Sequence, residues 1–365
     1  MSSKRRPSRP FFFLVVSLTL TGFFIFFSAS LGLLSRSGAE FSGVTLKQFL
    51  IMMVGLAALL IVSKIHYRYW QKFSWLVFLL GLISTALVFV PGLGPELKGA
   101  QRWVHIGGMS IQTSEFLKLG YVVYLASWLA RARDHVRSFR AGLLPFLIIT
   151  GIVGVLMVKQ PDLSTFGIML VAGVGMLFVA GISWRQLFLL IVIAIIGIGG
   201  VIYFKPYTQA RIKTFFEPNQ NVLGSSYQVN QSLIAIGSGG ITGRGFGQSI
   251  QKFKYLPEPI GDSIFSVAGE EFGFIGGTVL LTLFLGLILS GFKIAVGAPN
   301  QFSRLVTVGI VIMIGAGVFI NVASMVGLIP LNGTPLLFVS QGGTALLLVL
   351  IESGIILNIS KYTSA

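Results

Sequence analysis

The chain of 365 residues contains no cysteine, so disulfides and thiolate metal sites are excluded. Its three histidines, His66, His105 and His135, lie far apart in the sequence, which argues against a histidine-based zinc site. Only 10% of the residues are charged, compared with about 25% in soluble domains. A chain with so few charges lacks the polar surface that a soluble protein of this size needs.

Long apolar runs are what the sequence has in abundance, since 54% of its residues are hydrophobic. About 20 mostly apolar residues cross a bilayer as a helix. The run 305–351 is too long for one helix, and its prolines and glycines divide it into two. We therefore predict one all-α polytopic membrane domain, 1–365, with ten transmembrane helices. The other eight predicted helices are 10–35, 48–63, 73–95, 113–130, 141–158, 163–184, 186–204 and 272–292.

The basic residues predict the orientation of these helices. Ten is an even number, so both termini lie on one side of the membrane. If that side is the cytoplasm, 15 of the 27 Lys and Arg residues face it, including those of the basic tail 1–10. Six of the others lie in the long loop 205–263, between helices seven and eight, and long loops count weakly. The sequence thus predicts an N-in, C-in topology with 205–263 outside, and the first apolar run is interpreted as a retained helix.

The formal net charge of +16 could suggest a nucleic-acid partner. The basic residues punctuate apolar runs and form no basic face, so we expect no nucleic-acid binding. The acidic residues show another bias, because nine of the eleven fall on the outer side or in outer helix ends. Acidic residues contribute little to orientation. Their distribution therefore points to chemistry on the outer face.

Two short motifs place charges at the outer ends of predicted helices. Glu115 and Lys118 are three residues apart and share a helix face, where they form either a site or an ion pair that anchors the helix. Asp162 ends the turn Lys159-Gln160-Pro161-Asp162, where it caps the next helix, belongs to a site, or does both.

The loop 205–263 is long for a compact connection, and its aromatic residues argue against disorder. Its glycine-rich stretch 237–247 either presents backbone N–H groups to an anion or forms a series of turns. Asp262 lies where the loop enters the next helix. It acts there either as a site residue or as a helix N-cap, and in the second case Glu270 and Glu271 are paired within the bundle.

In their order along the chain, these motifs resemble the SEDS proteins (shape, elongation, division and sporulation), the FtsW/RodA group. The run Gln251-Lys252-Phe253 before Tyr255-Leu256-Pro257-Glu258-Pro259 is more similar to the division-type FtsW branch than to the elongation-type RodA branch. The matching stretches are 99–103, 112–118, 160–165, 231–247, 251–265, 269–276 and 335–343.

The resemblance implies a glycosyltransferase that polymerises glycan strands from lipid II on the outer face of the bacterial plasma membrane, at the division septum. It also implies a class B penicillin-binding protein and other division proteins as partners. The family's essential aspartate corresponds to Asp262, its acid–base pair to Glu115 and Lys118, and its Gln-Pro-Asp motif to 160–162. The chain departs from the family pattern at Thr113, Gly261, Ser263 and Gln341, none of which carries a charge.

From this resemblance we expect Asp262 to act as the base on an acceptor sugar hydroxyl, with inversion at the donor's anomeric carbon. The diphosphate leaving group needs cationic stabilisation, and a divalent ion (Mg²⁺ or Mn²⁺) is an expected cofactor, with no organic cofactor. Glu115 is expected to orient Lys118. The candidates for contacts with the substrate, besides Lys118, are Arg102, Gln160, Asp162, Arg244, Lys252, Glu258 and Ser340.

Three other hypotheses stay open on the sequence. A flippase for the lipid-linked precursor suits helices with buried charges, although no inverted repeat is evident between the two halves of the chain. An elongation-type polymerase differs only in its cellular role. A scaffold for a transpeptidase would tolerate a neutral residue in place of Asp262.

Overall fold

The computed structural model describes residues 6–35, 40–94, 101–106, 109–133, 135–217 and 225–363. Almost all regular structure in this part of the chain is helical. The long helices are α1 (Arg9–Ser30), α2 (Phe41–Val62), α4 (Ser74–Leu87), α5 (Thr113–Arg131), α6 (Leu144–Lys159), α7 (Leu163–Ala180), α8 (Trp184–Phe204), α9 (Pro206–Phe216), α10 (Ser225–Gly239), α11 (Ile264–Val296), α12 (Gln301–Met325) and α13 (Gly343–Ser360). Short turns of helix are η1 (Leu31–Ser35), α3 (Tyr67–Lys72), η2 (Phe139–Leu143) and η4 (Gln251–Phe253).

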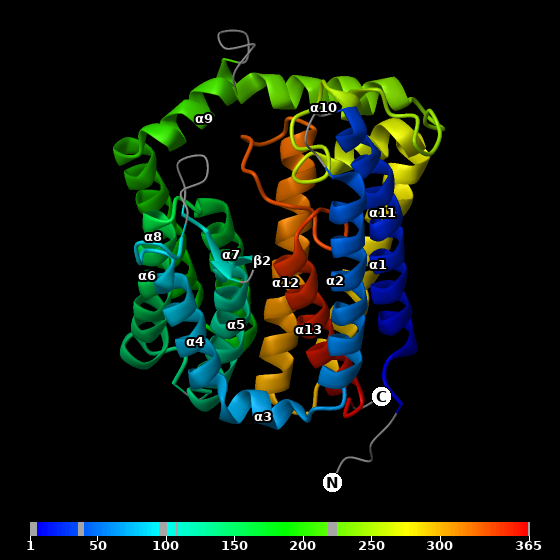
Figure 1. Cartoon of the computed structure of the whole chain (residues 1–365). Coiled ribbons are helices and arrows are strands. Elements are labelled where there is room, and N and C mark those ends of the chain that lie inside the picture. The colour runs from blue at the N-terminus through cyan, green and yellow to red at the C-terminus, as the bar shows by residue number, and fades with distance from the viewer. Residues whose placement is uncertain are drawn as a thin grey trace.

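Most of these helices run side by side in one bundle (Figure 1). Helix α1 begins and helix α13 ends at the same end of the bundle, and α9 and α10 lie across the opposite end. This agrees with the prediction of an even number of crossings. The predicted loop 205–263 contains two helices that lie crosswise over one end of the bundle, and turns follow the second of them.

Eight helical segments of the described chain are long and apolar enough to span a membrane: Arg9–Ser35, Phe41–Val62, Phe139–Lys159, Leu163–Ala180, Trp184–Phe204, Ile264–Val296, Gln301–Met325 and Gly343–Ser360. The prediction of a polytopic helical membrane protein is confirmed at this level. The two remaining predicted spans correspond to α4, which is apolar but short, and to α5, which carries Glu115 and Lys118. These two helices pack against each other.

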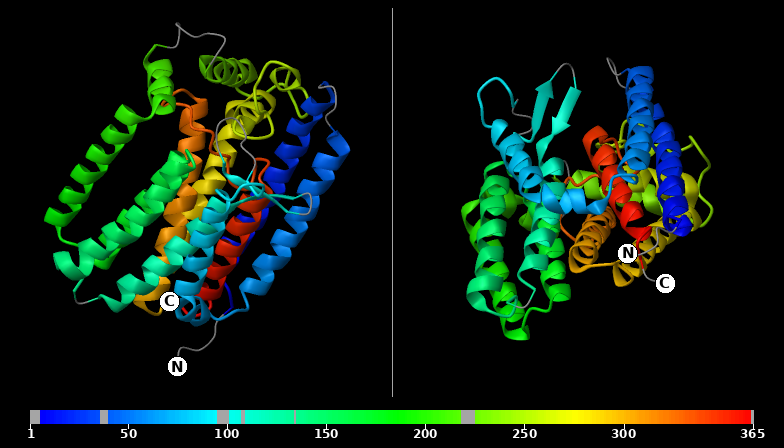
Figure 2. Two further views of the ribbon diagram at one scale, coloured as in Figure 1. Left: turned by 60° about the vertical axis from the view of Figure 1, so that its left-hand side comes forward. Right: turned by 90° about the horizontal axis from the view of Figure 1, so that it is seen from below.

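The helices form two groups when the bundle is seen along its length (Figure 2, right). One group holds α4 to α8, and the other holds α1, α2 and α11 to α13. The groups meet where α5 and α7 pack against α12. The segment 326–342 joins α12 to α13 and lies at this junction. Its prolines and glycines end α12, as the sequence predicted.

Three details differ from the prediction. The span predicted over 73–95 ends at Leu87, because Pro91 and Gly92 (φ 88°) form a turn. The span predicted over 272–292 begins earlier, at Ile264, and its helical backbone is interrupted at Gly273 (φ 64°, ψ −164°). An antiparallel hairpin of β1 (Trp103–Ile106) and β2 (Met109–Gln112) precedes α5, with Trp103 opposite Gln112. The prediction of an all-α chain missed this hairpin.

Candidate functional site

A partly open cavity lies where the two helix groups meet. One wall comes from α5 and α7, the opposite wall comes from α12, and the segment 333–337 closes one side. The lining residues are Arg102, Gln112, Glu115, Lys118, Asp162, Thr165, Ile168, Met313, Gly317, Gly333, Thr334, Pro335 and Leu337.

Glu115 and Lys118 form an ion pair on this wall, with 2.8 Å between Glu115 Oε2 and Lys118 Nζ. Their i,i+3 spacing on α5 brings the two side chains to one face. Each keeps only a small exposed fraction, 7% for the Glu115 side chain and 10% for that of Lys118. A charged pair that anchors a helix would face water or lipid headgroups, whereas this pair lines the cavity. The site interpretation is therefore favoured over the anchor.

Arg102 and Asp162 form a second pair beside the first. Arg102 Nη1 lies 3.8 Å from Asp162 Oδ1, and Ser114 Oγ donates to Asp162 Oδ2 at 3.2 Å. Asp162 occupies the N-cap position of α7, but its side chain makes no capping hydrogen bond there. The carboxylate is therefore turned to the cavity, and the site role predicted for Asp162 is the one that its side chain fits.

Asp262 lies next to Gly333, a residue that lines the cavity. A Cβ built on Gly333, a lining residue, would lie 3.3 Å from Asp262 Oδ2. The N-cap residue of α11 is Ser263, one residue after Asp262. Asn321 Nδ2 donates to the carbonyl oxygens of Asp262 at 2.8 Å and Thr334 at 2.7 Å. One buried amide thus ties the backbone of Asp262 to the cavity wall.

Two predicted substrate-binding residues lie behind the cavity wall. Gln160 is fully buried and its Nε2 donates to the carbonyl oxygen of Thr85 at 2.9 Å. Ser340 is 5% exposed and its Oγ donates to the carbonyl oxygen of Gly261 at 2.7 Å. Ser340 therefore holds the backbone next to Asp262, Gln160 ties its own turn to α4, and neither side chain lines the cavity.

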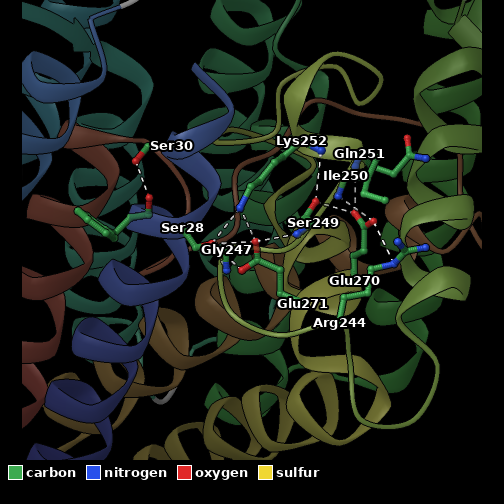
Figure 3. A network of polar contacts seen from close by, with 11 residues as sticks. Ser28, Ser30, Arg244, Gly247, Ser249, Ile250, Gln251, Lys252, Glu270 and Glu271 are labelled. Carbon is green, nitrogen blue, oxygen red and sulfur yellow. Dashed lines mark hydrogen bonds and ion pairs between the residues drawn. The ribbon is translucent and has the colours of Figure 1, made fainter. Parts of the chain in front are cut away.

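Three further predicted site residues lie away from the cavity. Lys252 is fully buried, and its Nζ is 2.6 Å from Glu271 Oε1 (Figure 3). Arg244 is partly exposed, and its Nε is 3.5 Å from Glu270 Oε1. Glu258 is exposed and lies in the turn that precedes α11. None of these three residues lines the cavity.

Sequence reasoning missed two residues that approach Asp262. Asn321 lies near the C-terminal end of the apolar helix α12, and a polar side chain in such a helix is a signal that could have been followed. Arg211 of α9 donates from Nη1 to the carbonyl oxygen of Asn332 at 3.2 Å, and its Nη2 lies 3.9 Å from the Cβ position of Gly333. Nothing in the sequence separates Arg211 from the other basic residues of 205–263.

Two cations and two carboxylates line the cavity, and the carboxylate of Asp262 lies beside its lining residue Gly333. Lys118 and Arg102 are positioned to bind an anionic group, and Asp262 is the candidate base. Among the described residues, no three His, Asp or Glu side chains are grouped to hold a metal ion. The described protein groups alone do not form a metal site there.

Comparisons with known proteins identify the family of the chain. The family profile described as "Cell cycle protein" (FtsW, RodA, SpoVE) matches residues 9–365. The chain is 40% identical to stage V sporulation protein E of Bacillus subtilis (strain 168) over 87% of both chains. It is 34% identical to a probable peptidoglycan glycosyltransferase FtsW of Geobacter sp. (strain M18) over 95% of both. A chain in a solved peptidoglycan synthase complex matches with a TM-score of 0.81 at 25% identity, covering 98% of this chain and 99% of that one. The chain therefore belongs to the FtsW/RodA/SpoVE family of membrane proteins.

Proposed function

We propose that this protein is a peptidoglycan glycosyltransferase that joins lipid II units into glycan strands, with the cavity as its active site. The name of the Geobacter relative supports the activity. The cavity supports it independently, because an inverting transfer needs a base opposite a cationic site for the leaving group. The observation that carries the proposal is the approach of Asp262 to a cavity lined by Lys118 and Arg102.

We propose ten membrane spans, the eight long apolar helices together with α4 and α5. In this topology the end that holds both termini faces the cytoplasm, and α9 and α10 lie on the extracytoplasmic surface of the plasma membrane. The positive-inside rule supports this orientation. The site then lies near the extracytoplasmic surface, where lipid II presents its sugars.

In the proposed reaction, the donor is a growing strand whose anomeric carbon bears a lipid-linked diphosphate. The carboxylate of Asp262 accepts the proton of the sugar 4-hydroxyl of lipid II. The freed oxygen attacks the anomeric carbon from the face opposite the diphosphate. The bond between that carbon and the diphosphate oxygen breaks, which inverts the carbon to a β-1,4 link and releases undecaprenyl diphosphate.

Lys118 and Arg102 are the proposed contacts of the diphosphate. Glu115 holds the ammonium of Lys118 in place, and Asp162 does the same for the guanidinium of Arg102. Fixed positive charges at the leaving group stabilise the charge that develops in the transition state. We also propose that a divalent ion binds here, with ligands from the diphosphate as well as from the protein.

A polymerisation assay with purified protein and lipid II tests the proposal. The native protein should form glycan strands, and Asp262→Asn should bind lipid II but lower strand formation by about 10²–10⁴-fold, the usual contribution of a positioned base. Near-native strand formation by Asp262→Asn would refute the role of Asp262. The same protein in liposomes tests the flippase alternative, which would be supported by lipid II translocation without strand formation.

The relatives support a cellular role and a partner for this protein. The FtsW relatives support septal wall synthesis in division, and the 40% identity to stage V sporulation protein E supports a sporulation role as the second candidate. The match to a peptidoglycan synthase complex supports a class B penicillin-binding protein as partner. Fluorescent fusions imaged in vegetative and sporulating cells would distinguish the two roles.

A further inference from the structure

A second group of charged side chains lies outside the cavity and is closed from solvent. It consists of Ser28 on α1, Ser249 and Lys252 in the turns before α11, and Glu270 and Glu271 on α11 (Figure 3). We call these five residues the buried network. All five are 1% exposed or less.

Glu271 is the acceptor at the centre of the buried network. It accepts hydrogen bonds from Lys252 Nζ at 2.6 Å and from Ser28 Oγ at 2.6 and 2.7 Å. Lys252 Nζ lies 3.2 Å from Ser28 Oγ as well. The ammonium is therefore surrounded by protein groups, and a diphosphate could reach it only if this packing opened.

Glu270 binds the backbone that carries Lys252. Its carboxylate accepts from Ser249 Oγ at 2.6 Å, from the N–H of Ile250 at 3.0 Å and from the N–H of Gln251 at 3.2 Å. The sequence analysis left open whether the glycine-rich stretch presents N–H groups to an anion or forms turns. It forms turns, and the N–H groups that follow them bind this internal carboxylate.

These contacts close the chain on itself around Asp262. The residues at the start of the segment 249–272 are bound by the side chains at its end. Between these two ends lie the turn of Glu258 and the site residue Asp262. Asn321 and Ser340 hold the middle of the segment through the carbonyl oxygens of Asp262 and Gly261.

The break at Gly273 directly follows the buried network. A Cβ on Gly273 would lie 2.3 Å from the backbone nitrogen of Gly243 and 2.5 Å from the carbonyl oxygen of Ile241. The turn at 240–245 therefore packs directly on α11 where its helical backbone is interrupted. Regular helix geometry is therefore interrupted between the residues after Gly273 and the first part of α11, which contains Glu270. Contacts outside the helix must fix the position of this first part.

We propose that Lys252, Glu270 and Glu271 are positioning residues, which fix the segment 249–263 so that the carboxylate of Asp262 faces the cavity. This inference rests on the proposed function for the role of Asp262. In place of the diphosphate contact that the sequence suggested for Lys252, it assigns that residue a role through its partner Glu271. The two roles make opposite predictions for a pair of substitutions.

The test compares Lys252→Met, Glu271→Gln and the double variant in the strand-formation assay. Each single change leaves one buried charge without its counter-charge, so kcat should fall about 100-fold. The double variant keeps an acceptor for Ser28 and removes both charges, so kcat should return to within about fivefold of the native value. The KM for lipid II should stay within about twofold in all three variants, because none of these side chains contacts substrate.

Hydrogen exchange of the amides in 249–263 gives a readout that does not depend on activity. The single variants should exchange faster there and the double variant at the native rate. If the native protein forms no strands, the proposed function fails, yet the exchange pattern still tests the positioning role. A double variant as inactive as Lys252→Met, or a raised KM, would overturn the inference in favour of a diphosphate contact. Unchanged kcat per folded molecule in the single variants would overturn it in favour of a purely structural pair.

Discussion

The cavity and the buried network contain the same kinds of charged side chain, but these side chains have different roles. Each has a lysine paired with a glutamate, at 2.8 Å for Lys118–Glu115 and at 2.6 Å for Lys252–Glu271. The first pair keeps some exposure and lines open space, whereas the second has none and is surrounded by protein donors and acceptors. Both regions contain an ion pair, so an ion pair alone does not identify a substrate site. The difference between them is that a ligand can reach the pair at the cavity, whereas the pair in the buried network is enclosed by protein groups.

The largest effect among the variants that probe this contrast is expected at the cavity pair. Lys118→Met should lower strand formation about 10²–10³-fold, because it removes a fixed positive charge at the leaving group. The measurement is kcat with purified, folded protein. Lys293→Met, a lysine on the last turn of α11, is the control and should keep native activity. Native activity in Lys118→Met would remove the cavity pair from the mechanism.

The second-largest loss of activity is expected for Asn321→Ala. It leaves the carbonyl oxygens of Asp262 and Thr334 without their donor, at a cost of about 1–3 kcal/mol for each buried group left unpaired. Activity should fall about 10–100-fold and the thermal midpoint should also fall. Asn321→Gln is the matched variant, because it keeps the amide group on a side chain that is one methylene longer. A loss of stability with full activity per folded molecule would contradict a role in placing Asp262.

Gly333→Ala should have a smaller effect, about tenfold in strand formation. The left-handed backbone at Gly333 (φ 69°) disfavours a Cβ by about 1–2 kcal/mol, and that Cβ would contact the carboxylate of Asp262. Gly327→Ala is the control, because Gly327 has a similar φ of 73° but its Cβ would meet Val229 and Leu233. Equal losses of activity in both variants would show that backbone strain alone is responsible.

The smallest effect is expected for Arg244→Ala, less than about threefold. The Arg244 side chain is 38% exposed, and exposed ion pairs contribute about 0–1 kcal/mol. Glu270 keeps its three other donors. Arg102→Ala, at the cavity, should lose about tenfold more activity than Arg244→Ala. Equal losses would contradict the separation of the two regions.

Much of the fold follows from hydrophobic length and helix-breaking residues. These predicted the division of 305–351 into α12 and α13 and the start of α5 near Thr113. The hairpin before α5 was missed because its two strands are only four residues each. The early start of α11 was missed because Glu270 and Glu271 interrupt the apolar run, and only their buried partners make a helix there acceptable.

The site was predictable where a charge is unusual for its surroundings. Glu115, Lys118 and Asp162 met that condition, and the structure places all three at the cavity. Lys252 met it equally well, but its partner lies nineteen residues along the chain and its Ser28 contact lies on α1. Pairing of this kind depends on tertiary packing, which no local spacing reveals.

The central claim is that the cavity acts on substrate while the buried network only positions Asp262. Its most direct test measures strand formation by two double variants side by side, Glu115→Gln/Lys118→Met and Lys252→Met/Glu271→Gln. Both remove one buried pair of charges and leave a neutral amide in place of the carboxylate. The account predicts that the first stays at least about 100-fold below native activity and that the second lies within about fivefold of it. Recovery in the first variant, or lasting inactivity in the second, would contradict the account.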